Sequence, residues 1–402
     1  MRDELGLDYT SSQPDDTKIF NQILTRYLSS DATTMASLEE FLTKNPEMPM
    51  AMMLRAYLLK LAADPRFKVP INQCVDTLAT RTDLNEREKL HREALTLWRD
   101  NQLLRAVETF DKIISLYPKD ILAIRVAHYL HFYGQGSSAM VDSLAKVVGN
   151  WRPDETFYGY LKGMECFALE ELGEYAQAEL AGREALSINS TDIWAAHAVT
   201  HIMQMQGRFN EGVLLIDSLR NNWHDANNFV NHMHWHLALL NIGLGDSDQA
   251  LRIYDDFLIE PIKDDFYLDI CNSASLLWRL VMLGIDVGDR WQHLHEISRH
   301  RVEDDELVFS TLHYLMAPAV LGDQETISRC LNNIETWSAR TDTQSLVCRK
   351  VGVTLAEVIC ELNQGESKFA AEKLAGIQPQ ISQIGGSHAQ RHLFEQMIEY
   401  YA

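Results

Sequence analysis

The chain has 402 residues, 46% of them hydrophobic, so it can bury a large core. No Pro/Gly/Ser-rich linker divides it, which favours one continuous array over two unrelated domains. Lys and Arg number 36 against 57 for Asp and Glu, which gives a formal net charge of −21 that is spread along the chain. This balance argues against nucleic acid and anionic membranes as partners, because both require a basic surface.

The first residues, MRDELGLDYTSSQPDD, are polar and acidic where a signal peptide would be basic and then apolar. The most apolar later stretch, SLLWRLVMLGI, is short and contains Arg279, so it is not expected to span a membrane. Six scattered cysteines form no CxxC pair, as expected for reduced and mostly buried thiols. We therefore expect a cytoplasmic protein.

Helical patterns alternate with short Gly- or Asp-marked turns, and no convincing run shows the alternation of a strand, which predicts an all-α fold. In chain order, residues 1–84 are expected to form divergent N-terminal helices. Residues 85–260 hold the clearest repeats, and residues 261–402 form divergent C-terminal helical pairs of the same 1–402 array.

A turn residue followed five positions later by a small residue recurs through the central part of the chain. Its interval is near 34 residues, and the helix endings ISLYPKD and LSINSTD are similar to those of tetratricopeptide repeats. The pattern predicts an α-solenoid of tetratricopeptide-like helical pairs, curled around a concave pocket. The pairs are Asn101 with Ala106, Gly134 with Ala139, Gly173 with Ala178, Gly207 with Gly212, and Gly245 with Ala250.

Two histidine pairs with i, i+4 spacing are the most informative motif. His197 and His201 form one pair, and His232 and His236 form the other, 35 residues further on. Each pair projects from one face of its own helix, and the offset is close to one helical-hairpin repeat. Four imidazoles are therefore expected to converge on one volume.

The repeat register adds further side chains to the predicted concave face. Helical positions that line the groove in this repeat class carry imidazole, indole, phenol and carboxamide groups, with His236 at the border and His234 at a packing position. The groove residues are His128, His131, Tyr160, Trp194, His197, His201, Gln204, His232 and Trp235.

Several segments, among them AHYLHFYG, ALSINSTDIWAAHAVTHIMQMQGR, NHMHWHLAL and GGSHAQRHLFEQ, resemble those of the tetratricopeptide repeat protein 38 family, in the family's order from about residue 85 onward. The resemblance implies a soluble helical-repeat protein and no firm biochemical activity. Asn272 departs from a common aspartate, and His388 and His392 stand where the family has other residues. Positions that match the family pattern are His128, His197, His201, His232, His236, Asp269, His313 and Arg391.

A divalent metal such as zinc is one interpretation of the two pairs, because catalytic zinc commonly takes three protein ligands plus water. The four paired histidines would suffice, with Asp269 or His313 as a further ligand. Metal-free acid–base chemistry is a second interpretation, with one imidazole as base and Asp269 fixing a tautomer. The third is structural: groove and core histidines satisfied by hydrogen bonds and by stacking on tryptophan. The zinc-peptidase motif HExxH is absent from the sequence.

Arg391 follows the GlyGlySer turn at 385–387 and could bind a carboxylate or phosphate of a substrate, or tie the last helix to the array by a salt bridge. The leading functional hypothesis is a small-molecule enzyme, a hydrolase or lyase with or without metal. The alternative is a non-catalytic scaffold that holds a peptide in the groove.

Overall fold

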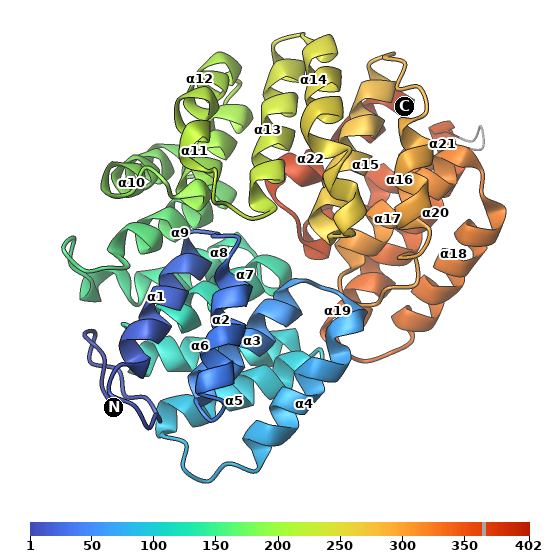
Figure 1. The fold of residues 1–402 in the computed structure, drawn as a ribbon. Coiled ribbons are helices and arrows are strands. Elements are labelled where there is room, and N and C mark those ends of the chain that lie inside the picture. Colours follow the sequence, from blue (N-terminus) through green and yellow to red (C-terminus); the bar gives the residue numbers. More distant parts are fainter. Residues whose placement is uncertain (364–366) are drawn as a thin grey trace. The chain divides into compact units, whose positions relative to one another are not determined.

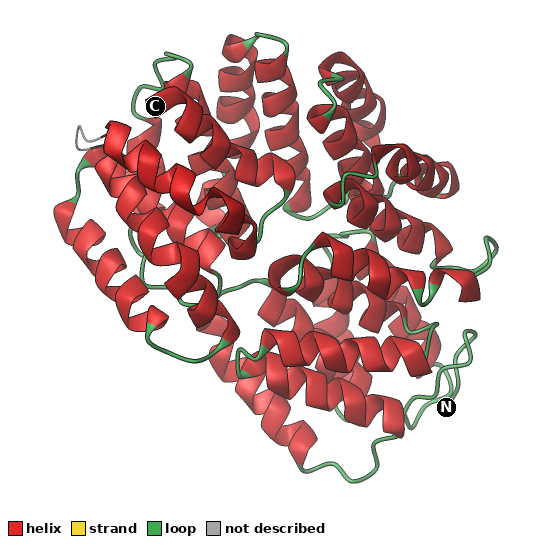
Figure 2. Cartoon of the chain, turned by 180° about the vertical axis from the view of Figure 1, so that it is seen from behind, coloured by secondary structure: helices red, strands yellow, loops and turns green. Residues whose placement is uncertain are grey.

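The computed structural model describes residues 1–363 and 367–402, and within these ranges it contains helices and loops but no strand (Figure 2). Isolated β-bridges join Arg2 to Asp8 and Asp31 to Ala226. Helices follow one another through short connections along the chain (Figure 1), and sequential neighbours such as α5 and α6 or α9 and α10 pack together. The predicted all-α, solenoid-type helical-repeat fold is confirmed.

The chain divides into two compact units, and helix α11 (Ile193–Met205) runs from one into the other. The first unit comprises Met1–Ile202 with Ser218–Phe229, and the second comprises Met203–Asp217 with Val230–Ala402.

The other helices of the first unit are α1 (Asp16–Leu28), α2 (Thr34–Lys44), α3 (Pro49–Leu61), α4 (Lys68–Ala79), α5 (Glu86–Arg99), α6 (Leu103–Leu116), α7 (Ile121–Gly134), α8 (Ser137–Ala145), α9 (Tyr158–Glu171) and α10 (Tyr175–Ile188). From the second unit boundary onward the chain forms α12 (Phe209–Leu219), α13 (Phe229–Gly243), α14 (Ser247–Ile253), α15 (Tyr267–Met282), α16 (Arg290–Ser298), α17 (Val308–Leu321), α18 (Gln324–Ser338), α19 (Thr343–Val347), α20 (Val353–Glu361), α21 (Ser367–Ile377) and α22 (His388–Tyr401).

The predicted turn-to-small-residue frame corresponds to left-handed turns between paired helices. Asn101, Gly173, Gly207 and Gly245 all have positive φ, between 55° and 86°, which favours glycine or asparagine. The small residue that follows lies in a tight helix contact: a Cβ added to Gly212 would come within 2.8 Å of Leu240. The frame therefore reflects both the turn and the packing of the next helix.

The frame is displaced at one repeat. Gly134 is the last residue of α7 rather than the turn residue, and an added Cβ would approach Leu103 within 2.5 Å. The left-handed residue is Gly136, with φ of 86°. Here the first glycine provides the close helix contact and the second provides the turn.

A buried polar network lies in the first unit where α3, α5 and α7 come together. Asp120 accepts a hydrogen bond from Arg87 Nη1 at 2.7 Å, and its Oδ2 lies 2.9 Å from His91 Nε2. The Tyr57 hydroxyl lies 3.1 Å from His91 Nδ1, and Asp120 also caps α7 by accepting from the backbone N–H of Ala123 at 3.0 Å. All four side chains are almost completely buried, so the network joins three helices inside the core.

The six cysteines are free and buried, as the sequence predicted. Burial raises the pKa of Cys74 to about 11 and that of Cys348 to about 12, so both stay thiols at neutral pH. No helix in the described residues is both long and apolar enough to cross a bilayer.

Candidate histidine site

The first unit packs three of its histidines against an aromatic wall formed by α7, α9 and α11. His197 and His201 point the same way from α11, with ring centroids 4.3 Å apart. The His197 ring stacks on Phe167 at 5.7 Å, and His128 from α7 meets the Trp194 ring edge-on at 6.0 Å. The sequence prediction of one shared face for this pair agrees with this geometry.

Glu170 of α9 lies against the imidazole of His201. Its Oε2 is 3.3 Å from His201 Nδ1, and both side chains are fully buried. Ligand atoms of Glu170, Glu171 and His201 lie within 4.8 Å of one another. The first unit therefore offers carboxylate oxygens together with imidazole nitrogens, a donor set that suits a divalent transition metal.

The second unit holds the other pair on α13 in a similar environment. The rings of His232 and His236 have centroids 4.7 Å apart, and His232 stacks on Trp235 at 5.2 Å. His232 Nδ1 lies 3.0 Å from Asn272 Oδ1 of α15, and His236 Nδ1 lies 2.9 Å from Gln204 Oε1.

These contacts determine which ring nitrogen carries the hydrogen. An amide oxygen can only accept, so Nδ1 of His232 donates to Asn272 and Nδ1 of His236 donates to Gln204. Histidines that ligate metals are commonly held in this way by an acceptor on the other nitrogen. Both histidines of the α13 pair are thus held through Nδ1.

The remaining predicted residues are distributed more widely. His131 contacts Asp111, with Nε2 3.2 Å from Asp111 Oδ1, in a contact that also includes Ser143 and Lys146. Tyr160 accepts from Asn189 at 3.3 Å, and burial raises its pKa to about 12.

Three predicted residues belong to the C-terminal half of the chain. Asp269 accepts from Asn231 Nδ2 at 3.2 Å, one turn before Asn272 on α15. His313 is buried in α17, where Nδ1 donates to the carbonyl of Phe309 at 2.7 Å. Arg391 donates to the carbonyl of Gly386, so it fastens the turn before α22.

Sequence reasoning missed Glu170 and Arg279. Both stand among apolar residues at helical spacing, in CFALEE and SLLWRL, where a charged side chain must be buried. That pattern is the signal that could have identified them, because a buried charge needs a specific partner. Asn272 is a departure from the family pattern, and its side-chain amide oxygen accepts a hydrogen bond from His232 Nδ1.

Stability should fall in acid because of His313. Burial, reinforced by the charge of Arg279, lowers the pKa of His313 to about 4, whereas an unfolded histidine titrates near 6.5. Between these values unfolding takes up a proton, so the free energy of unfolding should decrease by up to about 1.4 kcal/mol for each pH unit below 6.5. Urea unfolding from pH 4.5 to 7.5 measures this slope, and His313→Gln should make it shallower. His224→Gln, at an exposed histidine, should leave the slope as in the wild type. If His313→Gln and the wild type have parallel profiles of unfolding free energy against pH, His313 does not contribute to the acid sensitivity.

No protein-family model matches the chain. A solved structure described as "Structure of Naa15/Naa10 bound to HypK-THB" is similar over 91% of this chain, with 13% sequence identity and a TM-score of 0.28. The chain spans 63% of the length of that protein. The resemblance to the tetratricopeptide repeat protein 38 family stays a prediction.

Proposed function

We propose that the protein is a metal-dependent enzyme, a hydrolase or lyase that acts on a small molecule. In the first unit, His197, His201 and Glu171 would supply the ligands, and Glu170 would orient His201. The observation that supports this most strongly is the buried group of Glu170, Glu171 and His201, whose ligand atoms lie within 4.8 Å of one another.

A nitrogen-rich set of this kind suits zinc, cobalt or nickel better than magnesium or calcium, which prefer oxygen. When bound, such an ion supplies a Lewis acid and lowers the pKa of a coordinated water to about 7. Catalytic zinc commonly takes three protein ligands and one water, so the two α11 histidines and one carboxylate of α9 would be enough. The aromatic rings of Phe167 and Trp194 would limit access of bulk water to these groups.

Metal analysis tests the proposal. Protein purified without a metal-affinity tag should retain about one equivalent of a divalent transition metal, measured by inductively coupled plasma mass spectrometry. The double variant His201→Gln/His236→Gln keeps polarity and approximate size, so it should stay folded by circular dichroism and lose the metal. Cobalt substitution should give the visible absorption of nitrogen ligation in the wild type and none in this variant.

His295→Gln is the matched control, because His295 also contacts a carboxylate, Asp323 at 2.9 Å, but lies outside both pairs. It should retain the metal. A wild-type chain that binds neither zinc nor cobalt after reconstitution would exclude metal chemistry and favour the peptide-holding scaffold. A double variant that unfolds would show that the two histidines are structural.

A further inference from the structure

Arg279 of α15 is a buried cation in the second unit whose contacts are all neutral. Its relative exposure is 3%, and its guanidinium donates to Ser275 O at 3.2 Å, to Ser275 Oγ, and to Ala389 O at 2.8 Å. These bonds use three of the five N–H groups of an arginine. In the described part of the chain no carboxylate lies within 4.0 Å of this group, and burial lowers its pKa.

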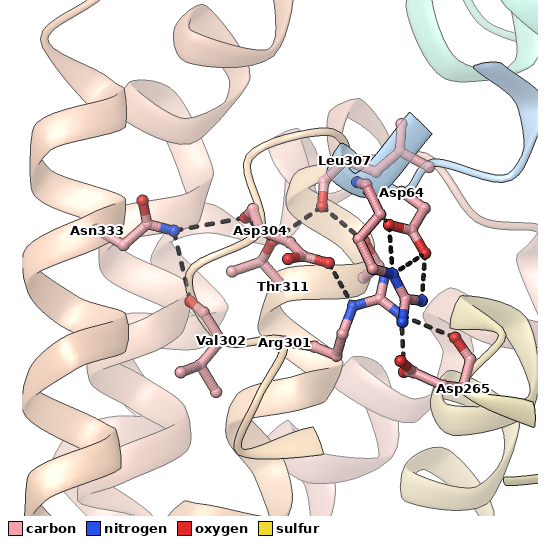
Figure 3. A network of polar contacts seen from close by, with 10 residues as sticks. Asp64, Asp265, Arg301, Val302, Asp304, Leu307, Thr311 and Asn333 are labelled. Carbon is pink, nitrogen blue, oxygen red and sulfur yellow. Dashed lines mark hydrogen bonds and ion pairs between the residues drawn. The ribbon is translucent and has the colours of Figure 1, made fainter. Parts of the chain in front are cut away.

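Arg301, in the same unit, is also a buried arginine, but it has carboxylate partners. Its Nε donates to Asp304 at 2.6 Å and its Nη1 donates to Asp265 at 2.8 Å (Figure 3). Two carboxylates thus neutralise Arg301. A buried charge without such compensation is costly, so Arg279 calls for an anion that the chain itself does not provide.

Polar groups without a protein partner lie near Arg279. The guanidinium carbon is 5.8 Å from the centre of the Trp235 ring, and the bonds to Ser275 bring the guanidinium back to within one helical turn of Asn272. The indole N–H of Trp235 and Nδ2 of Asn272 are buried and have no hydrogen-bond partner in the described residues. Both are donors, as an anion requires.

We propose that Arg279, together with the Asn272 amide and the Trp235 indole N–H, binds an oxyanion, namely a carboxylate or phosphate group of the ligand. The remaining guanidinium N–H groups can hold two oxygens of such a group. The same Asn272 orients His232 through its Oδ1, so this oxyanion would lie beside the α13 histidine pair. The inference depends on the second unit alone and holds whether or not metal binds.

Thermal unfolding of the full chain tests this site with two probes, sodium phosphate and sodium acetate, each titrated against sodium chloride at constant ionic strength. At least one oxyanion should raise the Tm of the wild type saturably, as expected for a ligand that binds only the folded state. A response to phosphate alone identifies a phosphate ligand, and a response to acetate alone identifies a carboxylate. Arg279→Met should lose the response, and Arg279→Lys should keep a weaker one.

Arg290→Met is the matched control, since Arg290 pairs with Asp255 on the surface at 2.6 Å and should leave the anion response intact. The proposal is overturned if neither anion stabilises the wild type, or if Arg279→Met responds as strongly as the wild type. Should Arg279→Met fail to fold, NMR line broadening of the anion that stabilises the wild type, phosphate or acetate, is compared between the wild type and Arg279→Lys. Equal line broadening in the two proteins would overturn the proposal. Because metal content is measured separately, failure of the anion site is distinguishable from failure of the metal site.

Discussion

Asp120→Asn should lower the free energy of unfolding by about 3–5 kcal/mol, the range expected when one partner of a buried ion pair is removed. Burial alone would raise the pKa of Asp120, but His91 and Arg87 outweigh this and hold the pKa well below its usual value. The variant leaves the Arg87 guanidinium without its buried counter-charge and weakens the cap of α7. Urea unfolding followed by circular dichroism measures the change.

Asp83→Asn provides the control, because Asp83 pairs with Arg81 on the surface and its side chain is 53% exposed. Exposed pairs contribute little, so this variant should change stability by no more than about 0.5 kcal/mol. Equal effects of the two variants would show that the Asp120 network does not hold α3, α5 and α7 together.

Glu170→Gln should weaken binding of a divalent metal by about 10-fold, and Glu170→Leu by up to about 100-fold, the range observed when acceptors behind metal-bound histidines are removed. Glutamine keeps a polar oxygen beside His201 Nδ1 but loses the negative charge that strengthens the imidazole as a ligand. Leucine loses both the oxygen and the charge. Competition with a chromophoric chelator measures the affinities.

Glu165→Gln tests whether the effect is specific to Glu170. Glu165 is on the same helix and forms an ion pair with Lys162, so its replacement should not change metal affinity. Equal affinities for wild type, Glu170→Gln and Glu170→Leu would mean that Glu170 does not position a ligand.

The histidine pairs and the helical pairing could be predicted because both depend on local periodicity. An i, i+4 spacing places His197 and His201 on one face wherever the helix packs, and the rings are indeed adjacent. The exact turn residue was less certain, because Gly134 and Gly136 are both compatible with a turn in sequence. The positive φ of Gly136 and the close approach of Leu103 to Gly134 separate their roles.

The partners of these histidines could not be predicted in the same way. Glu170 and His201 are 31 positions apart, and His232 and Asn272 are 40 apart, so their contacts depend on how whole helices pack. For Arg391 the partner is local but was also not predicted. Its charge suggested a contact with a ligand, whereas its guanidinium donates a hydrogen bond to the carbonyl of Gly386, five residues earlier.

The reactivity of the buried thiols can report local unfolding separately in each unit. A thiol that is buried and protonated does not react with an alkylating reagent, so labelling occurs only in molecules whose surrounding helices have separated. Cys74 and Cys166 lie in the first unit, and Cys271 and Cys330 lie in the second. The rate of alkylation at each cysteine, read by mass spectrometry of the peptides, therefore separates the opening of one unit from that of the other in a chain that needs no added label.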